Sequence, residues 1–235
     1  MIIGVDEAGR GPVIGPMVIA GVLTDPKTAQ DLSVLGVRDS KKLSPKRREE
    51  LSKEISSKCQ VYLFLLSPGD IDSKRETENL NMIEARTYSA IIAELLGRLP
   101  PGDLAHCQVY VDAVDVNEAR YGNTIRTFLP EQYTHVKIIS EHKADDTYPV
   151  VSAASIMAKT RRDAEVSAIA QEMGRDLGSG YPSDPVTDRF LRDWLKTHKD
   201  LPPCVRHSWD TAKRLLRERD TKYMTLDKYT CEGGN

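Results

Sequence analysis

The chain has 235 residues, of which 40% are hydrophobic, and its formal net charge at pH 7 is −2. This length suits one large domain, or a core domain with a smaller appendage, and the apolar content is sufficient for a sizeable core. The composition excludes several classes: no segment approaches the roughly 20 apolar residues of a membrane span, no signal-peptide pattern opens the chain, and the four cysteines form no CxxC pair. We therefore expect a cytoplasmic, reduced, monomeric protein without a zinc site or disulfides.

Charge is unevenly distributed. Lys and Arg gather in the segments 38–48, 159–162 and 213–219. Such basic surface on an acidic chain fits a phosphate-contacting face beside an acidic pocket. Solvated helix faces are the alternative explanation for each segment.

The first half of the chain alternates predicted strands and helices. Residues 2–6 and 13–23 are rich in Ile and Val and predict two strands joined by a glycine- and proline-containing loop. Ser44 and Pro45 suit the first positions of a helix that runs to about residue 58. The apolar run 60–66 predicts a buried strand, and apolar residues at helical spacing predict a helix over 81–99.

The second half begins with predicted strands at 107–113 and 134–140. Residues 150–173 contain few helix breakers and predict a long helix that ends at Gly174. Two further helices, 186–198 and 208–219, follow a turn-rich hinge. The pattern indicates an α/β core over 1–175, a small helical C-terminal subdomain over 176–220, and a flexible tail over 221–235.

The glycine-rich segment "GRGPVIG" after the first strand is not a nucleotide-binding loop. Its spacing is G-x-G-x-x-x-G, and it leads into a β-branched segment instead of a helix. The chain also contains no GKS or GKT sequence, which excludes a P-loop.

Acidic residues follow three predicted strands. Asp6 and Glu7 close the first strand, Asp112 ends the strand in "VYVDA", and Asp145 and Asp146 come soon after the strand over 134–140. Sites form at strand ends in α/β sheets, and clustered carboxylates need cations to offset their repulsion. Oxygen ligands suit Mg²⁺ or Mn²⁺, and two such ions promote phosphodiester hydrolysis. Ordinary turn residues are the alternative for each single acid.

Other polar residues carry less weight. His142 could orient a ligand or attract a phosphate, or it could be a surface histidine. Ser152 and Ser155 fit a close-packed helix face better than a nucleophile, and no G-x-S-x-G motif is present.

Five segments together resemble type 2 ribonuclease H in its archaeal form. They are "GVDEAGRGPVIGPMV", "VRDSKKLS", "VYVDA", "EHKADDTYPVVSAASIMAK" and "GSGYPSDP", in the order that the family has them. The resemblance covers residues 1 to about 219. It implies an RNase H-like core with a mixed β-sheet flanked by helices, and a helical C-terminal region. It also implies hydrolysis of the RNA strand of RNA–DNA hybrids, and nicking on the 5′ side of single ribonucleotides in duplex DNA, leaving a 3′-hydroxyl and a 5′-phosphate.

The resemblance assigns roles to individual residues. The catalytic, metal-binding acids would be Asp6, Glu7, Asp112 and Asp145; the family's "HKAD" pattern selects Asp145 over Asp146, with Glu141 a weaker competitor. Two Mg²⁺ or Mn²⁺ ions would act during catalysis. The substrate-binding residues would be Gly9, Arg10 and Gly11 at the ribose 2′-hydroxyl, Tyr181 at the junction deoxyribose, and Lys41, Lys143 and Arg206 at phosphates.

Three further interpretations remain open at this point. A non-catalytic binder of RNA–DNA junctions would use the acids structurally, and a resolvase or exonuclease could share the core. Residues 223–230 faintly resemble a sliding-clamp-binding tail, but Tyr223 stands where that motif has Gln, and Tyr229 and Thr230 stand where it has paired aromatic residues.

Overall fold

The computed structural model describes residues 1–37 and 43–231, with residues 222–231 described by their helical backbone alone. The chain forms two compact units. The first unit comprises Met1–Arg10, Met17–Leu66 and Thr77–Ala164. The second comprises Gly11–Pro16, Ser67–Glu76 and the chain from Glu165 onward. In the described ranges, no helix is both long and apolar enough to cross a membrane.

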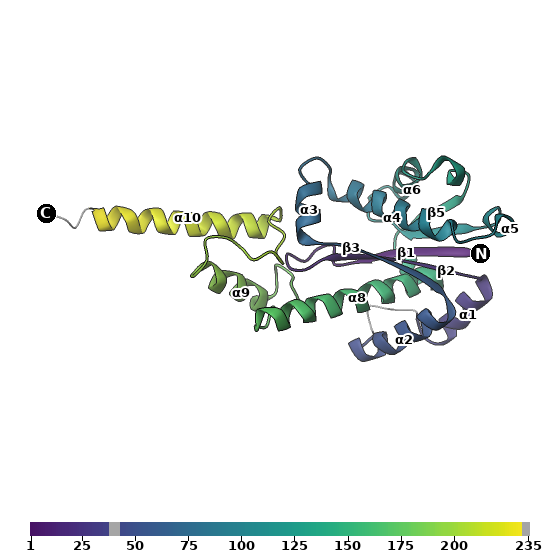
Figure 1. Cartoon of the computed structure of the whole chain (residues 1–235), viewed down its shortest axis with the longest axis horizontal. Coiled ribbons are helices and arrows are strands. Elements are labelled where there is room, and N and C mark those ends of the chain that lie inside the picture. Colours follow the sequence, from purple (N-terminus) through teal and green to yellow (C-terminus); the bar gives the residue numbers. More distant parts are fainter. Residues whose placement is uncertain (38–42, 232–235) are drawn as a thin grey trace. The chain divides into compact units, whose positions relative to one another are not determined.

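A five-stranded mixed sheet forms the centre of the first unit (Figure 1). β1 pairs antiparallel with β2, which pairs antiparallel with β3, whereas β1, β4 and β5 run parallel to one another. The prediction of a mixed sheet flanked by helices is confirmed. In sheet order the strands are β3 (Gln60–Leu66), β2 (Met17–Thr24), β1 (Ile2–Ala8), β4 (Gln108–Asp112) and β5 (Lys137–Glu141).

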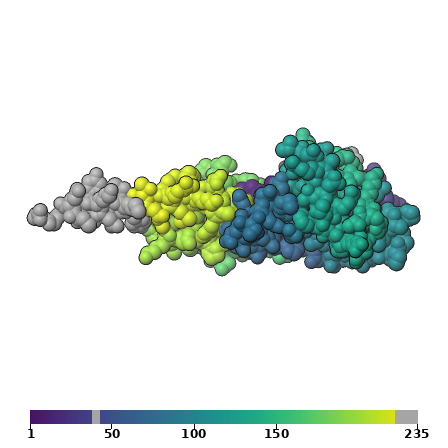
Figure 2. Space-filling view, turned by 90° about the horizontal axis from the view of Figure 1, so that it is seen from above, coloured from purple at the N-terminus to yellow at the C-terminus, as the bar shows by residue number. Residues whose placement is uncertain are grey.

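Helices cover both faces of this sheet. α4 (Leu80–Leu96) and α6 (Glu118–Thr127) lie on one face, and α1 (Pro26–Val34), α2 (Pro45–Lys58) and the start of α8 (Pro149–Met173) lie on the other (Figure 1). Figure 2 looks onto the α4 and α6 side, where blue and teal atoms from the middle of the chain cover the sheet. The short α5 (Pro101–Leu104) and α7 (Ala144–Thr147) lie in loops.

Gly21 of β2 explains how closely α4 approaches the sheet. A Cβ atom at Gly21 would lie 2.4 Å from Cγ2 of Ile91 and 2.7 Å from Cδ1 of Leu95. Real Cβ atoms do not tolerate such contacts, so only glycine at this position permits the observed packing of α4. The close approach brings the side chains of α4 within reach of β1.

The second unit is helical. It contains α3 (Pro68–Lys74), the end of α8, α9 (Pro185–Leu195) and α10 (Asp210–Cys231). Val13 and Ile14 pack in its core with Leu191 and Val205. The backbone amides of Val13 and Ile14 both donate to the carbonyl of Gly180, at 2.8 and 3.2 Å.

Several predicted boundaries need correction. Residues 13–16 belong to the second unit, so β2 starts at Met17. β3 is a strand as predicted, but it is the sheet's edge and only Leu66 in it is buried. α10 continues past Arg219 to Cys231. The sequence analysis also missed α1, α3 and α6. Its helix start at Pro45 is confirmed, as is the left-handed Gly174 after α8.

Candidate active site

The predicted acids lie on neighbouring parallel strands of the first unit. β1 and β4 pair in register up to Val5 and Val111, and the next residues are Asp6 and Asp112. Asp145 follows β5, in the first turn of α7. Because the carboxyl ends of parallel strands lie at one edge of the sheet, the fold brings these acids to the same edge.

The charges of the other three acids act on Asp6. Its side chain is only 5% exposed, and burial raises the pKa of Asp6 well above its ordinary value. The negative charge of Glu7 raises this pKa further, as do the charges of Asp112 and Asp145, while a hydrogen bond from Ser155 lowers it. A carboxylate in this setting is stabilised by a cation.

Asp6 also has partners that fix its orientation. Its Oδ1 accepts a hydrogen bond from the backbone amide of Glu7 at 2.8 Å. Ser155 of α8, which hydrogen-bonds to Asp6, is fully buried and accepts in turn from Nζ of Lys159 at 2.8 Å. The two serines of "VSAAS" are thus part of a packed helix face, as expected, and Ser155 also contacts the site.

Glu7 is held from the opposite face of the sheet. The hydroxyl of Tyr88 on α4 donates to Oε2 of Glu7, and Tyr88 is fully buried. Burial, with Glu7 as the next cause, raises the pKa of Tyr88 well above its ordinary value, so the phenol remains a donor. The ring of Tyr121 on α6 packs edge-on against Tyr88, with centroids 5.9 Å apart.

The other acids contact the backbone between β5 and α8. Oδ1 of Asp112 accepts from the amide of Ala144 at 2.8 Å. Asp145 is 4% exposed, and its carbonyl accepts from the hydroxyl of Ser152. Asp146 is exposed, which agrees with the selection of Asp145. The competitor Glu141 accepts from the hydroxyl of Tyr148 at 2.9 Å.

Lys143 has an unusual backbone conformation beside these acids. Its φ of 57° is the one positive value among the described non-glycine residues. Lys143 immediately precedes α7, two residues after the end of β5, and it is exposed. Left-handed residues other than glycine cluster at functional sites, where the fold holds them in place.

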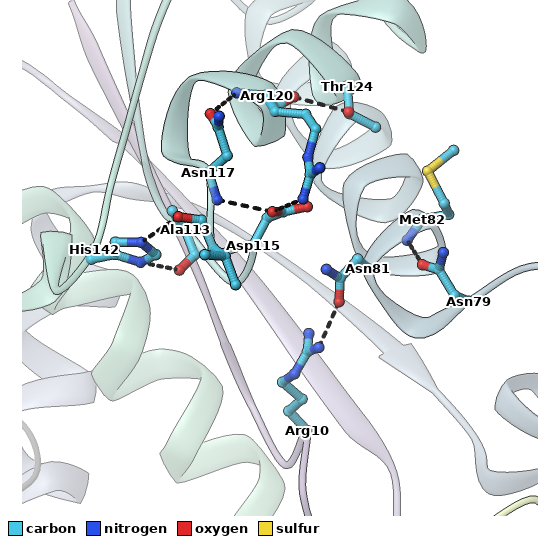
Figure 3. A network of polar contacts seen from close by, with 11 residues as sticks. Arg10, Asn79, Asn81, Met82, Ala113, Asp115, Asn117, Arg120, Thr124 and His142 are labelled. Carbon is cyan, nitrogen blue, oxygen red and sulfur yellow. Dashed lines mark hydrogen bonds and ion pairs between the residues drawn. The ribbon is translucent and has the colours of Figure 1, made fainter.

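Arg10 is bound to α4 (Figure 3). Its Nη2 donates to Oδ1 of Asn81 at 2.7 Å, and its Nη1 forms an ion pair with Glu84, whose side chain is fully buried. Asn81 also hydrogen-bonds to Asp115, in the loop after β4. Asp115 in turn binds Arg120, and the hydrogen bond from this arginine lowers the pKa of Asp115.

His142 contacts the same loop instead of the acids (Figure 3). Its Nδ1 lies 3.0 Å from the carbonyl oxygen of Ala113, and its backbone amide donates to Glu118 at 2.7 Å. These contacts connect the end of β5 to the segment after Asp112. They favour a structural position for His142 over the ligand-orienting role considered from the sequence.

The remaining substrate-binding predictions fall elsewhere. Gly11 and Tyr181 lie together in the second unit, where a Cβ atom at Gly11 would lie 3.3 Å from Cε1 of Tyr181. Tyr181 is 44% exposed. Lys41 lies outside the described residues, and Gly9 is buried at the end of β1.

Arg206 has a different environment from the one that its predicted phosphate contact requires. It is fully buried in the second unit, and its Nε donates to the carbonyl of Gly15 at 3.0 Å. Its guanidinium lies 4.7 Å from the ring centroid of Trp209, whose indole donates to the carbonyl of Gly11 at 3.2 Å. Arg206 therefore stabilises the loop over residues 11–16 in this structure.

The four acids suit a hard divalent cation by their chemistry, since every donor is a carboxylate oxygen. Their present side-chain positions do not converge: no three His, Cys, Asp or Glu within the described ranges lie close enough to hold an ion. Glu7 is turned to Tyr88 and Asp112 to the amide of Ala144. The charges of Glu7, Asp112 and Asp145 all raise the pKa of Asp6. The four acids are therefore near enough to affect one another, which supports their fit to a divalent cation.

Sequence reasoning missed the residues that hold this site. Glu84, Tyr88 and Asn81 all come from α4, and Tyr121 comes from α6. The spacing of Asn81, Glu84 and Tyr88, by three and then four residues, puts them on one helix face. That polar face, beside the apolar stripe used to predict the helix, was the available signal.

Comparisons with known proteins agree with this architecture. A family model described as Ribonuclease HII matches residues 3–212. A relative named Ribonuclease HII from Methanococcoides burtonii is 45% identical over 220 residues, covering 92% of this chain and 99% of the relative.

Two solved structures are also similar. The ribonuclease H2 of Pyrococcus horikoshii OT3 matches with a TM-score of 0.83 and 39% identity, over 93% of this chain and 98% of that one. A structure described as the PCNA:RNase HII complex from Archaeoglobus fulgidus matches with a TM-score of 0.77 and 39% identity, over 92% of this chain and 96% of that one.

Proposed function

The chain belongs to the ribonuclease HII family, and we propose that it nicks duplex DNA on the 5′ side of single embedded ribonucleotides as well as cleaving the RNA strand of hybrids. Ribonuclease H endonuclease activity on RNA–DNA follows from the family itself. The finer activity rests on one observation: four carboxylates at one sheet edge beside a glycine-flanked arginine. The products would carry 3′-hydroxyl and 5′-phosphate ends.

Enzymes of this family are metal-dependent. We propose that Asp6, Glu7, Asp112 and Asp145 would hold two Mg²⁺ or Mn²⁺ ions during catalysis. When bound, such ions supply activation of the attacking water and stabilisation of the leaving 3′-oxygen. The protein's own part is to bring the four acids to one edge of the sheet, where Ser155 binds Asp6 and the amide of Ala144 binds Asp112.

Ribose recognition would fall to the segment Gly9–Gly11. Glycine permits close approach of the backbone to a sugar, and the 2′-hydroxyl is the group that separates RNA from DNA. The contacts of Arg10 with Asn81 and Glu84 support a fixed geometry for this segment. The exposed ring of Tyr181 would pack on the junction deoxyribose, and Lys143 and Lys41 would contact phosphates as point charges.

A cleavage assay tests this proposal. A DNA duplex with one ribonucleotide is incubated with Mg²⁺ or Mn²⁺ and resolved on a denaturing gel, beside an all-DNA duplex and the Asp112→Asn variant. A single metal-dependent nick immediately 5′ of the ribonucleotide, absent from both controls, supports the proposal.

Other outcomes point elsewhere. Tight binding of the substrate without any cut would favour the non-catalytic junction binder. Cutting of a four-way DNA junction without regard to ribose would favour a resolvase. Full turnover by Asp112→Asn would exclude the assigned metal site.

We also propose a sliding-clamp contact through residues 223–230. The support is the Archaeoglobus fulgidus structure, which is described as a PCNA:RNase HII complex. In this chain the segment lies within α10, and its side chains are outside the described part. A pull-down with the clamp, using the chain with and without residues 221–235, tests the contact; equal binding by both forms would exclude it.

A further inference from the structure

The hydroxyl group of Tyr88 is a functional feature that the chemistry above does not require. Tyr88 is fully buried on α4, and its hydroxyl donates to Oε2 of Glu7. A buried tyrosine normally satisfies its hydroxyl with a nearby partner. Here the partner is an acid of the predicted metal site, on a different element of the fold.

The contact is part of a wider arrangement on α4. One turn before Tyr88, the buried carboxylate of Glu84 binds Arg10. Asn81 binds the same arginine, as Figure 3 shows. A single face of α4 therefore holds both Glu7 and Arg10. Gly21 lets this helix lie close to the sheet, so the contacts depend on backbone packing instead of flexible surface side chains.

Asp6 and Glu7 are held from opposite faces of the sheet. Successive residues of a strand point to opposite faces. Asp6 hydrogen-bonds to Ser155 of α8, whereas Glu7 hydrogen-bonds to Tyr88 of α4. Each helix layer thus contributes one hydroxyl to one of the two adjacent carboxylates.

We propose that Tyr88 is a positioning residue, whose hydroxyl fixes Oε2 of Glu7 and leaves Oε1 as the oxygen that binds a divalent cation. This inference rests on the proposed role of Glu7 as a metal ligand. Hydrogen bonds to ligating side chains orient them, and their loss typically lowers metal affinity by about 10- to 100-fold.

The structure offers a matched control in Tyr121. Its ring lies 5.9 Å from that of Tyr88 at 74°, and it is 1% exposed. Its hydroxyl is buried and makes no hydrogen bond within the described ranges. Tyr121→Phe therefore removes the same atom from a neighbouring, similarly buried ring, without removing a hydrogen bond to Glu7.

The test measures binding of Mn²⁺ alone to the full chain, by electron paramagnetic resonance of the free ion. We expect Tyr88→Phe to raise the dissociation constant for Mn²⁺ about tenfold or more. Tyr121→Phe should leave it unchanged. Equal affinities for wild type and Tyr88→Phe, or equal losses in both variants, would overturn the inference.

Two further variants separate this inference from the proposed metal site. Glu7→Gln should weaken Mn²⁺ binding strongly, and Tyr88→Phe should add nothing in the Glu7→Gln background, because Tyr88 acts through Glu7. If Glu7→Gln binds Mn²⁺ as wild type does, the metal site itself is wrong, and the inference is wrong with it. If Glu7→Gln loses binding while Tyr88→Phe keeps it, only the inference is wrong. An additive loss in the double variant would show a merely structural role for Tyr88.

Discussion

Arg10 forms an ion pair with Glu84, and the two side chains differ sharply in exposure, 33% for the arginine and 0% for the glutamate. The arginine is next to the strand that carries Asp6 and Glu7, and the glutamate is inside α4. A buried carboxylate needs its cation, because burial of an unpaired charge is costly. The pair therefore links the stability of α4 to the position of the Gly9–Gly11 segment.

We expect Arg10→Ala to destabilise the fold by about 3–5 kcal/mol, because it leaves the charge of Glu84 buried without its partner. Urea unfolding of wild type and variant measures this change. The control is Arg98→Ala, which lies just after α4, breaks an exposed pair with Glu94 of that helix and should cost less than about 1 kcal/mol. Similar losses in both variants would contradict the argument.

The double change Arg10→Met with Glu84→Met removes both charges of this pair. Replacement of a buried ion pair by apolar residues is often neutral or stabilising. We expect the double variant to recover most of the stability lost in Arg10→Ala but to discriminate poorly between ribonucleotide-containing and all-DNA duplexes. If the double variant is as unstable as Arg10→Ala, the arginine stabilises the fold through contacts other than the one with Glu84.

The sequence predicted the acids but not the residues that hold them. Asp6, Glu7, Asp112 and Asp145 stand out because each follows an apolar strand segment, and parallel strands bring their ends together. Tyr88 and Glu84 lie inside a helix whose apolar stripe was assigned to the core. Only the packing of α4 on the sheet shows that these polar side chains contact Glu7 of β1 and Arg10 just after it.

The local sequence pattern also does not show which of two hydrophobic cores an apolar segment joins. Val13 and Ile14 have the composition of a strand, and they directly precede β2 along the chain. In the structure they pack with Leu191 and Val205 of the second unit. Periodicity reports that a residue is buried, but it does not report in which core. The fully buried Arg206 is a related case, since a basic residue near the C-terminal helices suggests a surface contact with phosphate.

Lys143 should show separate effects on stability and on substrate binding. Asn adopts the left-handed conformation more readily than most residues, whereas a β-branched residue there is strained. We expect Lys143→Asn to keep the melting temperature of wild type, and Lys143→Val to lose about 1–2 kcal/mol of stability. Both variants lose the positive charge, so both should raise KM and reduce the salt dependence of substrate binding by about one unit of log–log slope. An unchanged slope would exclude the phosphate contact.

Asp6 should destabilise the fold at neutral pH. Its pKa in the folded chain is raised above the unfolded value of about 3.9. For a raised carboxyl pKa, the contribution to stability is complete below the unfolded pKa and is lost as pH rises through the folded pKa. In the presence of a chelator, we expect Asp6→Asn to melt at a higher temperature than wild type at pH 7, with no difference below about pH 4.

The exposed neighbour of the site provides the control for this prediction. Asp146→Asn makes the same chemical change beside Asp145. Because Asp146 is exposed, this variant should alter the melting temperature little. Added Mg²⁺ should raise the melting temperature of wild type more than that of Asp6→Asn. A lower melting temperature for Asp6→Asn at pH 7 would show that its hydrogen bonds outweigh the repulsion from the other acids.

Asp184 connects the acid stability of the second unit to the loop that carries Tyr181. Its Oδ2 accepts from the amide of Ser179 at 2.6 Å, its Oδ1 accepts from the amide of Val186 at 2.8 Å, and its own amide donates to the carbonyl of Tyr181 at 3.0 Å. Hydrogen bonds, first from Ser179, lower the pKa of Asp184 to about 2. A lowered carboxyl pKa contributes stability above the unfolded value of about 3.9, and this contribution is lost as pH falls through the folded pKa.

We therefore expect Asp184→Asn to be less stable than wild type above pH 4 or so, with the difference shrinking as the pH falls towards about 2. Asn cannot satisfy both amides, because one of its two side-chain atoms is a donor. The loosened loop should also raise KM for ribonucleotide-containing duplex, since Tyr181 would be less well positioned. Thermal unfolding across this pH range measures the first effect, with Asp146→Asn, which changes an exposed aspartate of the first unit, as the control. A stability difference that persists at pH 2 would show that Asp184 acts through packing and not through its charge.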